Sequence, residues 1–197
     1  MLTIFYSPHA TSVDNETGHA SGHADVLLSN QGRQQAIALG RQYAAIHVDA
    51  VFCSDLRRAA DTGTLMFGDR SVALITDARL REFDYGTMTQ WPRERVEAEF
   101  PQRVTTPFPG GESMLMVAKR MGDFLHDMLA AYDGKTIVVL GHRGTKWGLD
   151  YWAGRQSLEA IALTPWEWRA IPIWRYTLEQ HALAQRQPIV ARGAAET

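Results

Sequence analysis

The chain has 197 residues, a formal net charge of −2, and 45% hydrophobic and 21% charged residues. These values are ordinary for a globular protein and exclude a disordered or fibrous chain. The length suits a single domain that spans residues 1–197. The sequence has no overall basic field and no local basic patch, so we expect neither nucleic acid nor a membrane among its partners.

The first apolar run predicts a buried strand. Residues 2–6 are apolar, aromatic or β-branched, and the run breaks at Ser7-Pro8. His9 is therefore expected just beyond the end of a strand. Ser29 suits the N-cap of the helix that follows, in which apolar side chains recur at helical spacing.

The same order of strand, loop and helix recurs downstream. Residues 50–53 predict a second buried strand, and Ser54 or Asp55 can cap a helix that runs to Met66. Cys53, the single cysteine, lies in this strand and excludes an internal disulfide. Because we find neither a signal peptide nor an apolar run of membrane-spanning length, we expect a cytoplasmic protein.

A third strand completes the pattern. Residues 137–140 are apolar throughout, the polar cluster 141–144 follows them, and an amphipathic helix is predicted before them. A last strand is expected over residues 174–179. This alternation indicates an α/β three-layer sandwich, in which a mainly parallel sheet has helices on both faces. The polar clusters that follow the strands should then meet at the carboxyl ends of the sheet.

Prolines and glycines interrupt this order in the segment 87–112. We interpret the segment as a small cap insertion over the site, with one helix around residues 93–100. The tail, residues 185–197, is expected to be loose.

Several blocks of the sequence resemble one family. Pro8 to Asn15 reads PHATSVDN, which is similar to the signature Arg-His-Gly-Glu-Thr-x-x-Asn of the histidine phosphatase superfamily, the phosphoglycerate mutase-like proteins. His9 and Asn15 match this signature, and further matches continue through residues 22–36. The remaining similar blocks are Ser54–Thr62, Leu80–Gly86, Gly110–Ser113 and Leu140–His142.

The resemblance spans about residues 2 to 180 and implies a phosphoglycerate mutase-like fold and a hydrolase that acts on phosphate monoesters. It also assigns roles to individual residues. His9 would be the nucleophile, and Arg58, rather than its neighbour Arg57, would bind phosphate. Glu82 would be the acid, and His142 the second histidine.

The chemistry explains why these residue types are needed. A neutral imidazole can attack an anionic phosphate ester without charge repulsion, and water can later break the P–N bond that forms. We therefore expect a neutral His9 and a phosphohistidine. Arg58, Asn15 and His142 are expected to stabilise the equatorial oxygens without a metal or another cofactor. Glu82 would protonate the leaving alkoxide and then deprotonate water.

The sequence departs from the family pattern at the site. Pro8 stands where the family has an arginine, and Ala10 stands where it has a glycine. One phosphate-binding cation is therefore missing. Arg143 directly follows the second histidine, where the family usually has glycine, and we add it as a candidate phosphate-binding residue. The alternative is that Arg143 points outward or pairs with a carboxylate.

Each candidate has a plainer interpretation when taken alone. A single histidine, arginine or acid is more often a surface or packing residue, so the candidates gain weight only together. Asp84 and Glu112 are rivals of Glu82 as the acid. His19 and His23 have the spacing of zinc ligands on a helix, but nearby glycines disfavour a helix, and we expect no metal site. We expect packing roles for Trp147, Trp152, Trp166, Trp168 and Trp174.

The leading functional hypothesis is hydrolysis of a small phosphorylated molecule through a phosphohistidine at His9. One alternative is a non-catalytic domain that binds a phosphorylated ligand. Another is a pocket adapted to non-standard chemistry by the loss of the first arginine. Mutase activity is disfavoured because the cap segment is short. The sequence leaves open which substrate is used and whether the protein is a homodimer.

Overall fold

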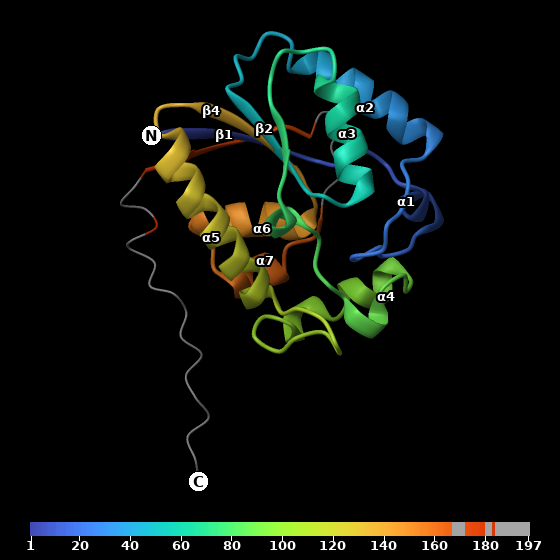
Figure 1. The fold of residues 1–197 in the computed structure, drawn as a ribbon. Helices are drawn as coiled ribbons and strands as arrows, with labels where there is room; N and C mark the ends of the chain where they lie inside the picture. Colours follow the sequence, from blue (N-terminus) through green and yellow to red (C-terminus); the bar gives the residue numbers. More distant parts are fainter. Residues whose placement is uncertain (167–171, 180–182, 184–197) are drawn as a thin grey trace.

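The computed structural model describes residues 1–166, 172–179 and 183 of the chain (Figure 1). At its centre lies a five-stranded sheet in the order β3-β2-β4-β1-β5. The strands are β1 (Leu2–Pro8), β2 (Ala50–Cys53), β3 (Leu74–Thr76), β4 (Thr136–Gly141) and β5 (Trp174–Leu178). β5 pairs antiparallel with β1, and the other pairings of these strands are parallel. The prediction of an α/β fold with a mainly parallel sheet is confirmed.

The register between β1 and β4 decides where two histidines meet. Pro8 lies opposite Gly141 at the end of the ladder. His9 and His142 directly follow these two residues and therefore lie next to each other. The His9 N–H donates to the Gly141 carbonyl at 2.8 Å and continues the pairing one residue past β1. The predicted break at Ser7-Pro8 is therefore wrong, because a proline at the last position of a strand removes one N–H without interrupting the preceding ladder.

Helices cover both faces of the sheet, as predicted (Figure 1). α2 (Asn30–Gln42) and α3 (Arg57–Phe67) pack on one face, and α5 (Met114–Tyr132) and α6 (Arg143–Trp152) pack on the other. Leu39 and Phe67 lie with Val51 in one core cluster. Phe124 lies with Val139 in the second cluster. Most side chains of the inner strands are apolar because both faces of these strands are covered.

The starts of two helices test the predicted caps. Ser29 caps α2 as expected and accepts an N–H of the first turn at 3.1 Å. The prediction that Ser54 or Asp55 caps α3 is wrong, because Leu56 occupies the N-cap without a side-chain hydrogen bond. Ser54 Oγ accepts the Leu56 N–H at 3.2 Å, and the Asp55 carboxylate pairs with Arg81, so both side chains are engaged elsewhere.

The remaining elements are short. They are α1 (Val13–Thr17), α4 (Arg93–Glu97), α7 (Leu158–Ala162) and the 3-10 turns η1 (Ala78–Leu80), η2 (Gly86–Met88) and η3 (Phe100–Gln102). The helix predicted around residues 93–100 thus ends at Glu97, and a separate turn that contains Pro101 follows it. Among the described helices, none combines the length and apolar character needed to cross a membrane.

Aromatic side chains attach the segment 87–112 to the rest of the fold. The Phe100 ring lies 4.6 Å from the Trp147 ring, and the Phe108 ring lies 5.1 Å from the Tyr85 ring, measured between centroids. α4 therefore lies near the carboxyl edge of the sheet. The tail 185–197 and Trp168, for which we made predictions above, lie outside the described residues.

Candidate active site

A pocket lies at the carboxyl ends of β1 and β4 and contains about 620 Å³ of empty space, part of it open to solvent. It collects side chains that are far apart in the sequence. All of the predicted site residues line it, namely His9, Asn15, Arg58, Glu82, His142 and Arg143. The structure thus brings the predicted residues together at the expected edge of the sheet, and their roles stay predictions.

The two ring nitrogens of His9 have different partners. Nδ1 lies 2.6 Å from the carbonyl oxygen of Ala10, which can only accept, so Nδ1 carries the proton. Nε2 keeps its lone pair and accepts a hydrogen bond from Arg58 Nε at 3.3 Å. Burial, together with the charge of Arg58, lowers the pKa of His9 to about 3. The ring is therefore neutral at neutral pH, with Nε2 as its nucleophilic atom.

Arg58, in the first turn of α3, is almost fully buried beneath the pocket. Its Nη1 donates to the Ala24 carbonyl at 2.9 Å, and its Nη2 donates to the Gly22 carbonyl at 2.8 Å. Burial lowers the pKa of Arg58, while surrounding carboxylates such as Glu82 raise it in part. Because its hydrogen-bond partners are neutral, the guanidinium keeps a positive charge that suits a phosphate group.

His142 is the N-cap of α6 and is 1% exposed. Its ring centroid lies 4.9 Å from that of His9, and neither of its ring nitrogens has a hydrogen-bond partner among the described residues. Burial and the nearby charge of Arg58 hold its pKa well below the usual range. Buried polar atoms are normally satisfied, so these nitrogens are available to a water molecule or a ligand in the pocket.

The carboxyl group of Glu82 is fixed through one of its oxygens. Oε1 accepts the N–H of Gly144 at 2.8 Å and the N–H of Phe83 at 3.0 Å. The Gly144 N–H belongs to the first turn of α6, where the helix dipole favours negative charge. Oε2 makes no hydrogen bond within the described part of the chain, which leaves one oxygen for proton exchange with a ligand.

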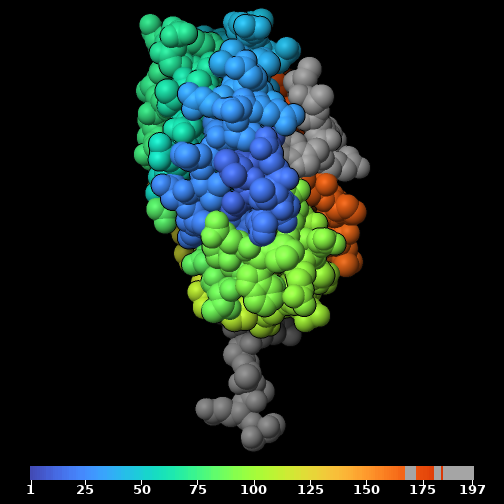
Figure 2. All heavy atoms as spheres, turned by 90° about the vertical axis from the view of Figure 1, so that its right-hand side faces the viewer, coloured from blue at the N-terminus to red at the C-terminus, as the bar shows by residue number. Residues whose placement is uncertain are grey.

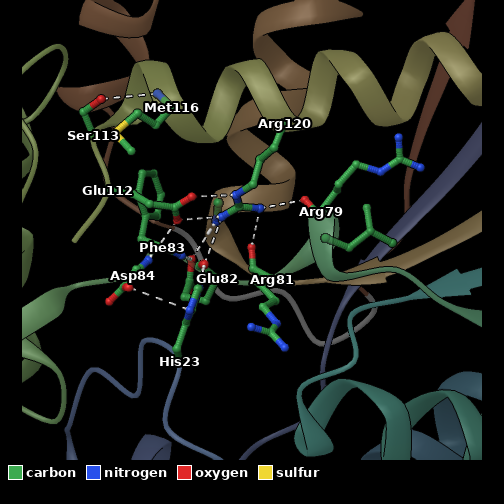
Figure 3. A network of polar contacts seen from close by, with 12 residues as sticks. His23, Arg79, Arg81, Glu82, Phe83, Asp84, Glu112, Ser113, Met116 and Arg120 are labelled. Carbon is green, nitrogen blue, oxygen red and sulfur yellow. Dashed lines mark hydrogen bonds and ion pairs between the residues drawn. The ribbon is translucent and has the colours of Figure 1, made fainter. Parts of the chain in front are cut away.

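The main chain around Glu82 is held from behind by Arg120 of α5 (Figure 3). This guanidinium donates, at 2.6 to 2.9 Å, to the carbonyl oxygens of Arg79, Arg81 and Glu82. His23 Nε2 lies 2.8 Å from the same Glu82 carbonyl. The acid is therefore anchored at both its main chain and its side chain.

The rival acids have other partners. Glu112 receives hydrogen bonds from Arg120 at 2.9 and 3.0 Å and from the Asp84 N–H at 3.0 Å (Figure 3). Burial raises the pKa of Glu112, but the bonds and charge of Arg120 outweigh burial and leave it lowered. Asp84 Oδ1 accepts the Gly86 N–H at 2.8 Å. Of these three carboxylates only Glu82 lines the pocket, and the geometry favours it as the acid.

Comparison with known proteins settles the family. A model of the histidine phosphatase superfamily (branch 1) matches residues 7–185. The chain belongs to this superfamily. Phosphoserine phosphatase 1 of Hydrogenobacter thermophilus is 29% identical over 150 residues, which cover 72% of this chain and 71% of the relative. The probable phosphoglycerate mutase GpmB of Erwinia tasmaniensis is 25% identical over 154 residues, with coverage of 72% and 70%.

The solved structures support the fold of this histidine phosphatase. YhfR of Bacillus stearothermophilus superimposes with a TM-score of 0.80 at 20% identity, over 91% of this chain and 93% of that protein. The predicted family and the predicted phosphoglycerate mutase-like fold are thus confirmed. So is the predicted enzyme class, a hydrolase of phosphate monoesters.

Asn15, the third predicted phosphate ligand, is fixed within α1 of this phosphatase. Its Oδ1 accepts the N–H of Ser12 at 3.0 Å, as part of a capping box at the start of the helix. This bond orients the side-chain amide and leaves its NH2 group as a donor. The residue therefore suits a phosphate oxygen at the pocket wall.

Arg143 combines both interpretations that the sequence left open. It lines the pocket together with Pro8, and its guanidinium also pairs with Glu97 of α4. The guanidinium carbon lies 5.6 to 5.8 Å from ring centroids of Phe100, Trp147 and Trp166. Burial acts to lower its pKa, but Tyr85 and Glu97 leave it raised. Arg143 thus keeps its positive charge and packs among aromatic rings. The negative charge of Glu97 offsets part of that positive charge.

Sequence reasoning missed two charged residues of the pocket. Arg93 and Glu97 line it from α4, and the sequence analysis treated their segment only as a cap. Their spacing of four residues on a predicted helix places both on one face and could have indicated them. His19 also lines the pocket. Within residues 1–166, 172–179 and 183, no group of three or more His, Cys, Asp or Glu side chains is arranged to hold a metal ion.

Proposed function

We propose that this histidine phosphatase hydrolyses a small phosphate monoester through a phosphohistidine at His9. The observation that carries the proposal is the state of the His9 ring. The Ala10 carbonyl holds the proton on Nδ1, so the ring is neutral and Nε2 carries the lone pair. Nε2 faces the guanidinium of Arg58, which is the proposed phosphate-binding cation.

The reaction consists of two displacements at phosphorus. His9 Nε2 attacks the phosphorus atom, the ester P–O bond breaks, and the Glu82 carboxyl group donates its proton to the leaving alkoxide. Glu82 then takes a proton from water, the water oxygen attacks phosphorus, and the P–N bond breaks. Inorganic phosphate leaves, and His9 returns to its neutral form.

Side chains stabilise the charge on the transferring group in the absence of a metal. Arg58 carries the buried positive charge, while His142 and Asn15 offer further polar contacts. We also propose that Arg143 supplies the cation lost at Pro8. Its position in the same pocket supports this role, whereas its pairing with Glu97 opposes it.

The class of substrate follows from the pocket and from the relatives. The pocket suits a small molecule, and one relative is named a phosphoserine phosphatase. We place the reaction in the cytoplasm, since the single cysteine, Cys53, is buried and forms no disulfide.

A non-catalytic phosphate-binding domain is the second candidate. A domain that only binds needs no neutral nucleophile next to a fixed carboxyl group, so the arrangement of His9 and Glu82 favours catalysis. A panel of phosphate esters assayed with the wild type and His9→Ala, with and without a chelator, tests the proposal. We expect turnover by the wild type in both conditions and a loss of roughly a thousandfold or more in His9→Ala. Phosphate-ester binding without turnover would support the binding domain instead.

A further inference from the structure

His23 joins the loop that holds the proposed phosphate-binding arginine to the segment that carries the proposed acid. It lies between Gly22 and Ala24, whose carbonyl oxygens accept hydrogen bonds from Arg58 at 2.8 and 2.9 Å. Its own ring contacts the carbonyl oxygen of Glu82 at 2.8 Å through Nε2. A carbonyl oxygen can only accept, so Nε2 carries a proton and donates it to this bond.

The loop that carries His23 packs closely against the segment that follows the acid. A Cβ atom added to Gly22 would lie 3.0 Å from a ring carbon of Tyr85, which is closer than an ordinary van der Waals contact. Farther along the two segments, the Gln90 N–H donates to the Ala20 carbonyl at 2.7 Å. Figure 2 shows these segments, in blue and green, side by side on one face of the molecule.

The peptide unit between Glu82 and Phe83 links His23 to the acidic side chain. Its carbonyl oxygen accepts hydrogen bonds from His23 and, at 2.9 Å, from Arg120. Its N–H, which belongs to Phe83, donates to Oε1 of the Glu82 carboxyl group at 3.0 Å. Because a peptide unit is planar and rigid, a change in the bonds to its oxygen also moves the N–H that orients the carboxyl group.

Protonation gives His23 a second partner on the same segment. Nδ1 lies 4.0 Å from Oδ2 of Asp84, which is too long for a hydrogen bond but close enough for attraction between an imidazolium and a carboxylate (Figure 3). The side chains of His23 and Asp84 are 29% and 38% exposed, so the ring can exchange protons with solvent. A charged ring also donates more strongly to the Glu82 carbonyl.

Among the carboxylates near the ring, Asp84 is the one left to respond to its charge. Asp55 and Glu112 also interact with His23, but each of them already pairs with an arginine. Within the described residues, Asp84 pairs with no arginine or lysine.

A proton on His23 adds a positive charge near three basic residues, which are Arg58, Arg120 and His142. The charge of Arg120 is offset by Glu112, and His142 is neutral because burial holds its pKa well below the usual range. The charge of Arg58 is offset when a phosphate group binds, so an anionic substrate favours the protonated ring.

We propose that His23 is a positioning residue for Glu82 that holds the acid more firmly when its ring is protonated. The inference rests on the proposed function, because it concerns how the proposed acid is oriented. Neutral His23 holds the Glu82 carbonyl alone. Protonated His23 holds this carbonyl and the Asp84 carboxylate, which fixes the segment at two points and keeps the carboxyl group in place for proton transfer.

The test measures the ratio of kcat for an alkyl phosphate ester to kcat for an activated aryl ester, at about pH 5.5 and about pH 8, on either side of the range in which histidine ordinarily titrates. The ratio reports proton donation, because aryl leaving groups hardly need it. His23→Gln keeps an N–H donor for the Glu82 carbonyl but takes up no proton. Both proteins share the ionisation of Glu82 itself, so their comparison removes it.

We expect the wild-type ratio to exceed that of His23→Gln by about fivefold at the lower pH and by less than about twofold at the higher pH, with little change in KM. His23→Ala also lacks the donor and should lower the ratio at both pH values. Asp84→Asn should remove the wild-type advantage at the lower pH. His47→Gln is the matched control, because His47 lies 3.5 Å from Asp49 but is exposed and outside the pocket lining.

Two results would overturn the inference. Equal ratios of the wild type and His23→Gln at both pH values would remove His23 from the positioning of the acid. A loss in His23→Gln of the same size at both pH values would leave the ring a structural role that is independent of its charge.

Nuclear magnetic resonance separates this inference from the proposed function, because it needs no turnover. In the wild type, the amide signal of Phe83 should shift with pH in step with the ring signals of His23, and His23→Gln should lose this shift. If the two signals move together but no ester is hydrolysed, the positioning by His23 stands and the proposed reaction fails. A Phe83 signal that is independent of His23 in an active enzyme would overturn the inference alone.

Discussion

Arg58 Nε and His9 Nε2 lie 3.3 Å apart, and the guanidinium donates to the lone pair of the imidazole ring. This bond orients the ring, and the charge of Arg58 adds to the effect of burial in lowering the pKa of His9. A phosphate group that enters the pocket competes for the same donor. In the proposed mechanism, Arg58 would turn to a phosphoryl oxygen and so release the lone pair of His9 for its attack on phosphorus.

The covalent intermediate gives the first prediction. During turnover, the wild type quenched without acid should gain one phosphoryl group in an intact mass measurement. His9→Ala should show no adduct and lose activity by roughly a thousandfold or more. His126→Ala, which changes an exposed histidine of α5, is the control. Wild-type turnover without an adduct, combined with near-normal activity of His9→Ala, would contradict the mechanism.

The role of Glu82 predicts a dependence on the leaving group. Glu82→Gln should slow the hydrolysis of alkyl esters by about a hundredfold or more, because their alkoxides need a proton. Activated aryl esters should be affected far less. Asp84→Asn and Glu112→Gln serve as comparisons, since both carboxylates lie outside the pocket lining. Equal losses on alkyl and aryl esters would show that Glu82 is not the proton donor.

The position of Arg143 predicts a loss of charge stabilisation. Arg143→Ala should lower turnover by about a hundredfold, and Arg143→Lys should also lower it because lysine lacks the guanidinium fork. Pro8→Arg in the Arg143→Ala background should recover part of the loss. Unchanged kinetics of Arg143→Ala, with a bound phosphate contacted by Arg58 and His142 alone, would rule out this role.

The hydrogen bonds of Arg120 predict a positioning role for this residue. Arg120→Met leaves Glu112 unpaired in a mostly buried place, and we expect it to lower the free energy of unfolding by about 3 kcal/mol. It should also reproduce the dependence on the leaving group that Glu82→Gln shows, because the carbonyls of Arg79, Arg81 and Glu82 lose the hydrogen bonds that Arg120 donates. A lower stability with an unchanged dependence on the leaving group would limit Arg120 to a structural role.

The buried histidines predict a loss of stability in mild acid. Burial lowers the pKa of His9 to about 3 and that of His142 well below the usual range, so the unfolded chain binds protons that the folded chain does not. The free energy of unfolding should therefore fall as the pH drops below about 6.5, by up to about 1.4 kcal/mol per pH unit for each histidine.

Chemical denaturation between pH 7 and pH 5 measures this slope. In that range the acidic side chains contribute little, because their ordinary pKa values lie lower. His142→Asn should reduce the slope of the unfolding free energy against pH by up to the contribution of one bound proton, about 1.4 kcal/mol per pH unit. An unchanged slope would show that His142 does not carry the effect.

Local sequence patterns determined the architecture and the family. The runs 2–6, 50–53 and 137–140 are short and mostly apolar, which favours buried strands, and the helical spacing between them indicates an alternating α/β order. The order of strands also requires that the residues after parallel strands meet at one edge. Motif spacing could therefore indicate His9 and His142 without coordinates.

Only the tertiary structure decided the state and the partners of the site residues. The Nδ1 proton of His9 depends on where the Ala10 carbonyl lies, and the low pKa of His9 depends on burial and on the charge of Arg58, 49 positions away. The pairing of Arg143 with Glu97 depends on where α4 packs. Periodicity encodes which face of an element is buried, but it contains no information on which polar groups meet across the interfaces. Those contacts are set by packing between segments that are distant in the sequence, and the electrostatics of the site follow from them.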